Sequence, residues 1–143
     1  MKDKKTVKRI LLFLIIVEFF NGLSGVAGGT GLISDPTAAA LGMKLEWLQG
    51  TPFNNYLIPG IVLFTFNGLG NLAAAFLSIY KNRYRAHFAL FFGVVMLIWI
   101  ISQVAWIGYK SFLQPLYFST GLLQAILGVL LMRNENAKPI KLK

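Results

Sequence analysis

Four long apolar stretches dominate the pattern of hydrophobic and polar positions along the chain. An α-helix rises about 1.5 Å per residue, so stretches of this length match the roughly 30 Å hydrocarbon core of a bilayer. The sequence therefore predicts an all-α fold, an integral membrane bundle of four transmembrane helices in a single domain, residues 1–143. The predicted spans are residues 10–29, 57–80, 88–109 and 115–132.

The stretch from Gly28 to Gly70 is too apolar for an ordinary loop and too broken by Gly and Pro for one helix. Within it, residues 30–56 connect the first two spans, and we call this connection the outer segment. The Asp-Pro pair at 35–36 predicts a helix start, because Asp caps a helix and Pro fits its first turn. The spacing of Leu41, Leu45 and Leu48 predicts one apolar helical face. We expect one or two short helices that lie on, or dip into, the outer face of the bundle.

The length of the outer segment leaves its role open between a lid and a structural cap over the helix ends. Trp47, Phe53 and Tyr56 are aromatic residues of the kind that suit a membrane interface. With Asp35 and Glu46, they are the outer-segment candidates for a binding role.

The composition, 56% hydrophobic and 13% charged residues, suits a bilayer protein rather than a soluble domain. The absence of cysteine excludes disulfides, thiolate metal sites and thiol redox enzymes, and the single histidine, His87, cannot build a histidine metal cluster. Catalysis by paired carboxylates lacks its pair, because Glu18 lies in mid-span while Asp35 and Glu46 lie in the outer segment. We expect no cofactor and no metal, and the sequence disfavours an enzyme.

In a soluble protein the net charge of +9 would suggest nucleic acid, but here the basic residues flank the spans. Twelve of the 14 Lys and Arg residues fall in the tails, 1–9 and 133–143, or in the turn 81–87, and only Lys44 and Lys110 fall on the other side. The positive-inside rule then places both termini in the cytoplasm, where the basic residues contact anionic lipid. We expect no nucleic-acid partner, an uncleaved first span and a disordered last tail.

Three of the spans carry polar residues at matching depths, which we call the polar layer. One set lies near the middle of the hydrocarbon and a second about one turn further out, and within each span the two residues share a helix face. The third span offers Met96 and Ile100 at these depths, with Gln103 higher. The polar layer comprises Glu18, Asn71 and Gln124 in the middle set and Asn21, Asn67 and Thr120 in the second.

A carboxylate that faces lipid is costly, so Glu18 is expected to face into the bundle. The polar layer is open to two interpretations. Its side chains either hold the helices together by hydrogen bonds, or line a cavity that binds a cation, a proton or a polar ligand. Pairs of small residues four apart, such as Gly25 and Gly29, favour close helix packing within the chain over dimerisation.

The stretch from Gly28 to Gly68 contains GGTGL, DP, ALG, GTPF, YLIPG and NG in that order. It resembles a group of small bacterial four-span membrane proteins that are described only as uncharacterised, in which a DP-x-G-like turn and an SPF-x-D-Y-x-I-P-G-like entry to the second span recur. Asn55 stands where that pattern has Asp, and Ala38 where it has Gly. The resemblance implies a multi-pass protein of the bacterial plasma (inner) membrane and carries no activity.

The sequence therefore predicts a non-enzymatic membrane protein that binds a lipid, a small ligand or a protein partner in a pocket between the outer segment and the polar layer. The alternative is a proton- or cation-coupled transporter with Glu18 as the coupling residue. Four spans are few for a transport pathway, so that alternative requires an oligomer. A homo-oligomer or a membrane-protein partner is compatible with the first prediction as well.

Overall fold

The computed structural model describes residues 4–136, and every regular element in that part of the chain is helical. Four helices are long and apolar enough to cross a membrane, which confirms the predicted fold class. The second of these spans is one continuous helix whose middle part is a π-helix, η3, which joins α2 to α3. The elements are α1 (Lys4–Ser34), the 3₁₀ helices η1 (Ala39–Leu41) and η2 (Leu45–Leu48), α2 (Leu57–Val62), η3 (Leu63–Leu69), α3 (Gly70–Ile79), α4 (Arg85–Ile107) and α5 (Leu113–Asn136).

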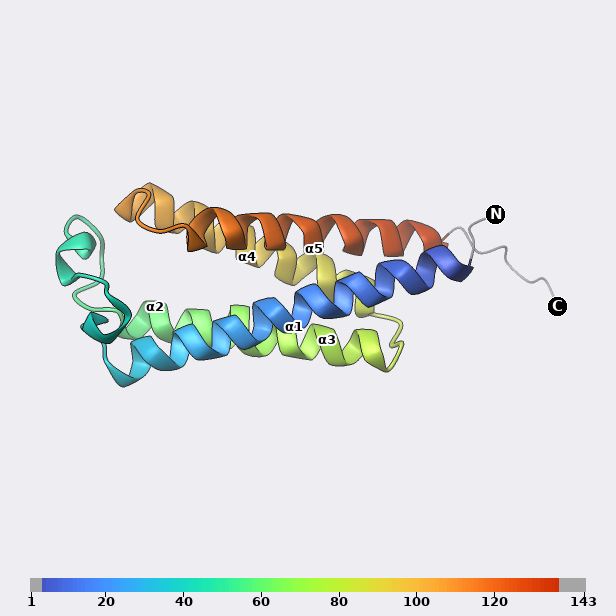
Figure 1. Cartoon of the computed structure of the whole chain (residues 1–143), viewed down its shortest axis with the longest axis horizontal. Coiled ribbons are helices and arrows are strands. Elements are labelled where there is room, and N and C mark those ends of the chain that lie inside the picture. The colour runs from blue at the N-terminus through green and yellow to red at the C-terminus, as the bar shows by residue number, and fades with distance from the viewer. Residues whose placement is uncertain (1–3, 137–143) are drawn as a thin grey trace.

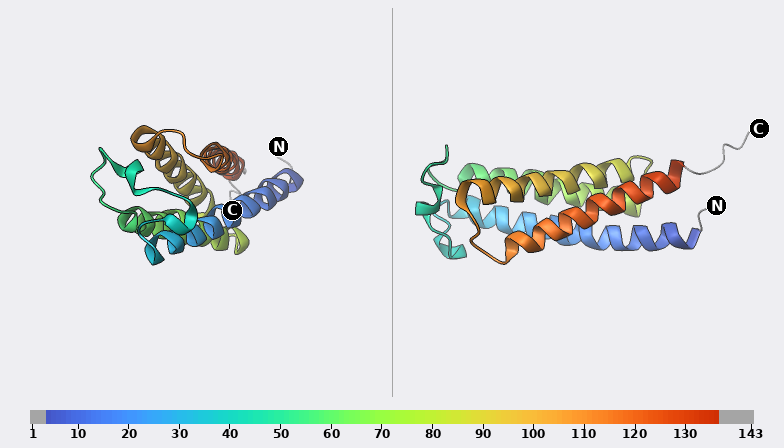
Figure 2. Two further views of the ribbon diagram at one scale, coloured as in Figure 1. Left: turned by 60° about the vertical axis from the view of Figure 1, so that its left-hand side comes forward. Right: turned by 90° about the horizontal axis from the view of Figure 1, so that it is seen from above.

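The bundle consists of two antiparallel pairs (Figure 1). Helix α4 packs along α5, while α1 packs along the α2–η3–α3 span and also contacts α5. The start of α1, the end of α5 and the α3–α4 turn lie at one end of the bundle, and the outer segment lies across the other end (Figure 2). Of the basic residues that the structure describes, only Lys44 and Lys110 lie on elements at the end that carries the outer segment.

Helix α1 runs to Ser34, past the predicted end of the first span at Gly29. Glycines in this stretch serve close packing instead of ending the helix, because a Cβ on Gly29 would lie 2.6 Å from the Cβ of Phe64. A Cβ on Gly25 would lie 2.5 Å from the backbone N of Gly68. The G-x-x-x-G pair therefore packs within the chain, as predicted.

The other helix ends also differ from the predicted spans. Helix α4 begins at Arg85, and α5 continues through 133–136, which the sequence assigned to a disordered tail. The last turn of α5 is held because Arg85 Nε donates a hydrogen bond of 2.7 Å to Glu135 Oε1. Helix α1 likewise begins within the predicted tail 1–9. The rest of the two tails lies outside the described residues.

The outer segment begins at Asp35 rather than at residue 30, and Asp35 does not start a helix. Its carboxylate organises a turn, accepting hydrogen bonds from the Thr37 hydroxyl (2.6 Å) and from the backbone N–H of Ala40 (3.3 Å). These hydrogen bonds lower the pKa of Asp35 below its usual value. Ala38 then adopts φ +57°, in the left-handed region that favours glycine, which is the residue expected here from the resembling group.

The outer segment forms two short 3₁₀ helices, within the expected one or two. Gly42, at φ +72°, ends the first of them, so the predicted continuous apolar face does not form. Leu48 is buried, whereas Leu41 and Leu45 are exposed. Buried Tyr56 fixes the segment by donating a hydrogen bond of 2.7 Å to the Lys44 carbonyl.

Candidate functional site

Four of the six residues of the polar layer form one buried hydrogen-bond network. Gln124 is its centre: it accepts a bond of 2.8 Å from Asn21 Nδ2, and its Nε2 donates a bond of 2.8 Å to Asn71 Oδ1. Thr120 Oγ1 donates a bond of 2.7 Å to Asn21 Oδ1. The network therefore ties α1, α3 and α5 together at the depth that the sequence predicts.

Helix α4 joins this network through its backbone. Gln124 Nε2 also donates a bond of 3.1 Å to the Ala89 carbonyl. The close approach that this requires is possible because Gly93 lies directly against α5, where a Cβ would be 2.8 Å from the backbone N of Ala125. The side chains of the network supply one another's hydrogen-bond partners. The network is therefore suited to stabilising the packing of the helices rather than to binding a ligand.

The other two residues of the polar layer, Glu18 and Asn67, are buried without partners for their side chains. Glu18 is 0% exposed, and neither of its carboxyl oxygens makes a well-formed hydrogen bond, although the buried Ser78 hydroxyl, itself without a partner, lies next to it. Asn67 lies in η3, and its amide group also makes none, although its backbone carbonyl accepts a bond of 2.8 Å from Asn71 Nδ2. Unpartnered buried polar groups are rare in proteins, so these two side chains are set apart from the network.

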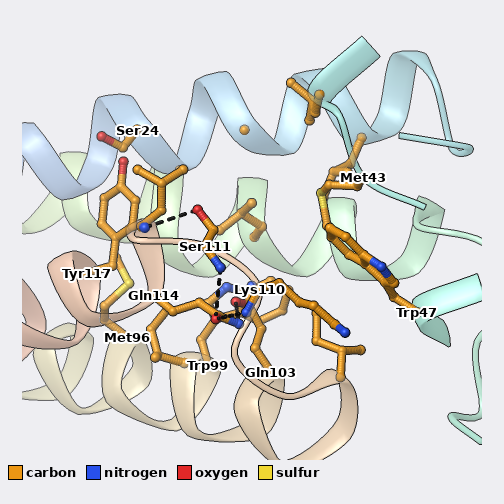
Figure 3. Close-up of a pocket in the computed structure, with 18 of the residues that line it drawn as sticks. Ser24, Met43, Trp47, Met96, Trp99, Gln103, Lys110, Ser111, Gln114 and Tyr117 are labelled. Atoms are coloured by element: carbon orange, nitrogen blue, oxygen red, sulfur yellow. Dashed lines mark hydrogen bonds between the residues drawn. The ribbon is translucent and has the colours of Figure 1, made fainter. Parts of the chain in front are cut away.

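A cavity of about 440 Å³ lies between the outer segment and the polar layer, where the sequence predicts a pocket. We call it the outer cavity. Its wall comes from all four spans, from the outer segment and from the α4–α5 loop, and is mostly apolar (Figure 3). Its lining includes Ser24 and Gly28 of α1, Trp47 of η2, Met96 and Gln103 of α4, and Tyr117 of α5.

The outer cavity exists because α1 and α5 are held together at the polar layer and diverge beyond it (Figure 1). Where they meet, the rings of Phe20 and Tyr117 stack with their centroids 5.7 Å apart. Beyond this contact, α1 presents the small residues Ser24, Gly25 and Gly28 to the cavity. The outer segment then covers the diverging ends, with the Phe53 ring 5.5 Å from that of Trp106.

One end of the outer cavity is polar. There Gln114, which is 5% exposed, folds the α4–α5 loop around its side chain. Its Oε1 accepts a hydrogen bond of 2.8 Å from the backbone N–H of Lys110, and its Nε2 donates bonds to the Gly108 carbonyl (3.2 Å) and to Gln103 Oε1 (3.5 Å). The Lys110 Nζ atom lies 5.4 Å from the centre of the Trp47 ring. The loop thus places one cation beside the cavity.

Of the candidates in the outer segment, only Trp47 lines the outer cavity. Asp35 belongs to its own turn, and Glu46 is exposed on η2. Phe53 contacts Trp106, and Tyr56 is buried in the segment's own core, where burial raises the pKa of its phenol. The six residues of the polar layer lie beneath the cavity and do not line it.

Sequence reasoning missed several lining residues. Lys110 counted there only in the charge balance across the membrane, and Gln114 fell in the unassigned turn between two predicted spans. The role of Gln114 was predictable in principle, since Gln103 and Gln114 are amides near the facing ends of two consecutive spans. Tyr117 and Ser24 gave no signal, because single hydroxyl residues are common in membrane helices.

Searches of protein-family models, curated proteins and solved structures found no match to the chain. Among the described residues, no group of three His, Cys, Asp or Glu side chains could hold a metal ion. The outer cavity and the unpartnered Glu18 are therefore the two features from which a function can be inferred.

Proposed function

We propose that this chain is a non-enzymatic multi-pass membrane protein that binds an amphipathic, lipid-like molecule in the outer cavity. The observation that carries the proposal is a cavity of about 440 Å³ with apolar walls and a polar end. That volume lies within the roughly 300–1,000 Å³ range of small-ligand pockets. At about 30 Å³ for each water-sized group, it holds on the order of 15 such groups, which corresponds to one acyl chain rather than two.

The proposed location is a bacterial plasma membrane with both termini in the cytoplasm. The gathering of basic residues on the elements at one end of the bundle supports this orientation, and those residues would contact anionic lipid at the cytoplasmic face. The outer cavity then opens toward the outer leaflet.

Large exposed apolar side chains, such as Phe13, Leu23 and Ile98, suit contact with lipid or with a second membrane protein.

Filling the outer cavity is expected to block binding. Ser24→Leu adds bulk to the α1 wall, whereas Ala27→Leu adds the same bulk to an exposed position of the same helix that does not line the cavity. In detergent micelles, a brominated monoacylglycerol is expected to quench Trp47 and Trp99 saturably in a Trp106→Phe background. Ser24→Leu should weaken this binding at least about tenfold, which is roughly 1.4 kcal/mol, and Ala27→Leu should not.

Equal quenching curves for Ser24→Leu and the parent protein would show that the ligand does not occupy the outer cavity. The helical content of both variants, measured by circular dichroism, controls for misfolding. Trp47 and Trp99 are suitable reporters because both line the cavity, whereas Trp106 does not.

A second candidate function, proton- or cation-coupled transport by an oligomer, is favoured by one observation: the buried, unpartnered Glu18 carboxyl group. It predicts that proteoliposomes dissipate an imposed pH or cation gradient and that Glu18→Gln abolishes this flux. Glu46→Gln, which removes an exposed carboxylate of the outer segment, should leave the flux intact. If Glu18→Gln retains every ion- or pH-dependent activity of the protein, this candidate function is rejected.

A further inference from the structure

The wall of the outer cavity carries hydrogen-bond donors and one cation but no acid. Among residues 4–136, Lys110 is the only charged residue that lines it, and no Asp or Glu does. A cation with neighbouring N–H and O–H donors, and with no acid beside it, is complementary to an anion. The charge of the lining therefore favours an anionic ligand in the outer cavity.

Lys110 is held in place at its backbone, while its ammonium group has no carboxylate partner in the part of the chain that the structure describes. Gln114 fixes the backbone N–H of Lys110, and Figure 3 shows Lys110, Ser111 and Gln114 close together, between Tyr117 on the left and Trp47 on the right. Within residues 4–136, the salt bridge that forms is between Arg85 and Glu135, at the other end of the bundle. The contact of Lys110 with the Trp47 ring is weak enough at an exposed site, roughly 0.5–1 kcal/mol, for the ammonium group to turn to an anion.

Gln103 supplies a second donor at the same end. Its Oε1 accepts the bond from Gln114 Nε2, which orients the amide group. Its own Nε2 makes no hydrogen bond among the described residues and belongs to the cavity wall. Lys110 and Gln103 therefore offer an ammonium group and an amide N–H to one ligand head group.

We propose that the outer cavity takes a single-chain amphiphile with a monoanionic carboxylate head, that is, a long-chain fatty acid. The head group binds at Lys110 and Gln103, and the chain lies along the apolar part of the wall, past Met96 (Figure 3). One cation matches one negative charge, and the volume matches one chain rather than the two of a phospholipid. This inference rests on the proposed function, because it names the ligand class of the same cavity.

The test compares three brominated probes in the Trp106→Phe background: a fatty acid, a monoacylglycerol and a phosphatidylglycerol. The parent protein is expected to bind the fatty acid about tenfold more tightly than the monoacylglycerol at a pH where the fatty acid is ionised. Lys110→Gln should abolish this preference, so that the fatty acid and the monoacylglycerol bind with similar affinity. Lys44→Gln, at the other basic residue of the same end, should keep the preference, because Lys44 does not line the cavity.

The outcomes separate this inference from the proposed function. If Ser24→Leu blocks the monoacylglycerol but Lys110→Gln leaves the preference for the fatty acid intact, the head-group inference is wrong and the proposed function stands. The same holds if Lys44→Gln lowers the preference as much as Lys110→Gln does, or if phosphatidylglycerol quenches as strongly as the fatty acid. If Ser24→Leu affects none of the probes, the proposed function itself is wrong.

Discussion

Replacing Gln124 with leucine is expected to lower the free energy of unfolding of the protein by about 2–4 kcal/mol. Gln124 is 0% exposed and takes part in hydrogen bonds with Asn21, Asn71 and the Ala89 carbonyl. Its removal leaves several buried polar groups without partners, each of which costs about 1–3 kcal/mol in soluble proteins and less in membranes, where the unfolded chain also finds partners.

The measurement is unfolding of the purified protein by a denaturing detergent in mixed micelles, followed by circular dichroism. Gln103→Leu is the matched control, because it makes the same substitution near the end of a span where the side chain has one long hydrogen bond of 3.5 Å. We expect the control to cost under about 1 kcal/mol. Equal effects of the two substitutions would show that the network around Gln124 does not hold the bundle together.

Gln124→Leu is also informative about the site. The network lies beneath the outer cavity and contributes no lining residue to it. A destabilised Gln124→Leu protein that still binds the monoacylglycerol, at a detergent concentration where it stays folded, would separate the structural part of the polar layer from the binding site. Loss of binding in the folded protein would instead show that the polar layer shapes the cavity.

Depth counting along the spans predicted the network well. Helical rise converts sequence position into depth, which placed Asn71 and Gln124 at one level and Asn21 and Thr120 about one turn further out. The observed hydrogen bonds join these two levels. The contribution of α4 was not predictable in this way, because the Ala89 carbonyl is a backbone group that any residue would supply. It becomes available only because Gly93 lets α4 approach α5 closely.

The outer segment shows where pattern reasoning fails. The segment was predicted to begin directly after Gly29, but α1 continues to Ser34 and packs Gly29 closely against Phe64. The position of the pocket followed from the sequence, since a long apolar cover lies above a polar layer. Apart from Trp47, the residues that line the pocket could not be predicted. The lining depends on the divergence of α1 from α5 and on the loop folded around Gln114.

Replacing Glu18 with leucine is expected to have the opposite effect on stability and to raise the free energy of unfolding by about 1–3 kcal/mol. Glu18 is fully buried, and both of its carboxyl oxygens lack hydrogen-bond partners. Burying a polar group without a partner costs roughly that much, and burying an ionised one costs more, so an apolar side chain of similar size removes a penalty.

The same detergent titration measures this effect, and Glu135→Leu is its control. Glu135 pairs with Arg85, whose side chain is 10% exposed, so removing Glu135 leaves a nearly buried cation without its partner. Glu135→Leu is therefore expected to lower the stability. The two substitutions are identical in type and opposite in expected sign, so a general effect of added hydrophobicity cannot explain the result.

Either sign for Glu18→Leu is informative about why a carboxyl group lies inside the bundle. A gain in stability means that Glu18 is not kept for packing, which strengthens the second candidate function, in which it exchanges a proton or a cation. A loss of stability means that the carboxyl group has a partner in the lipid-embedded protein, such as a water molecule or the neighbouring Ser78 hydroxyl, which is also buried without a partner. The Glu18→Gln flux experiment then separates a structural water or ion from a transported one.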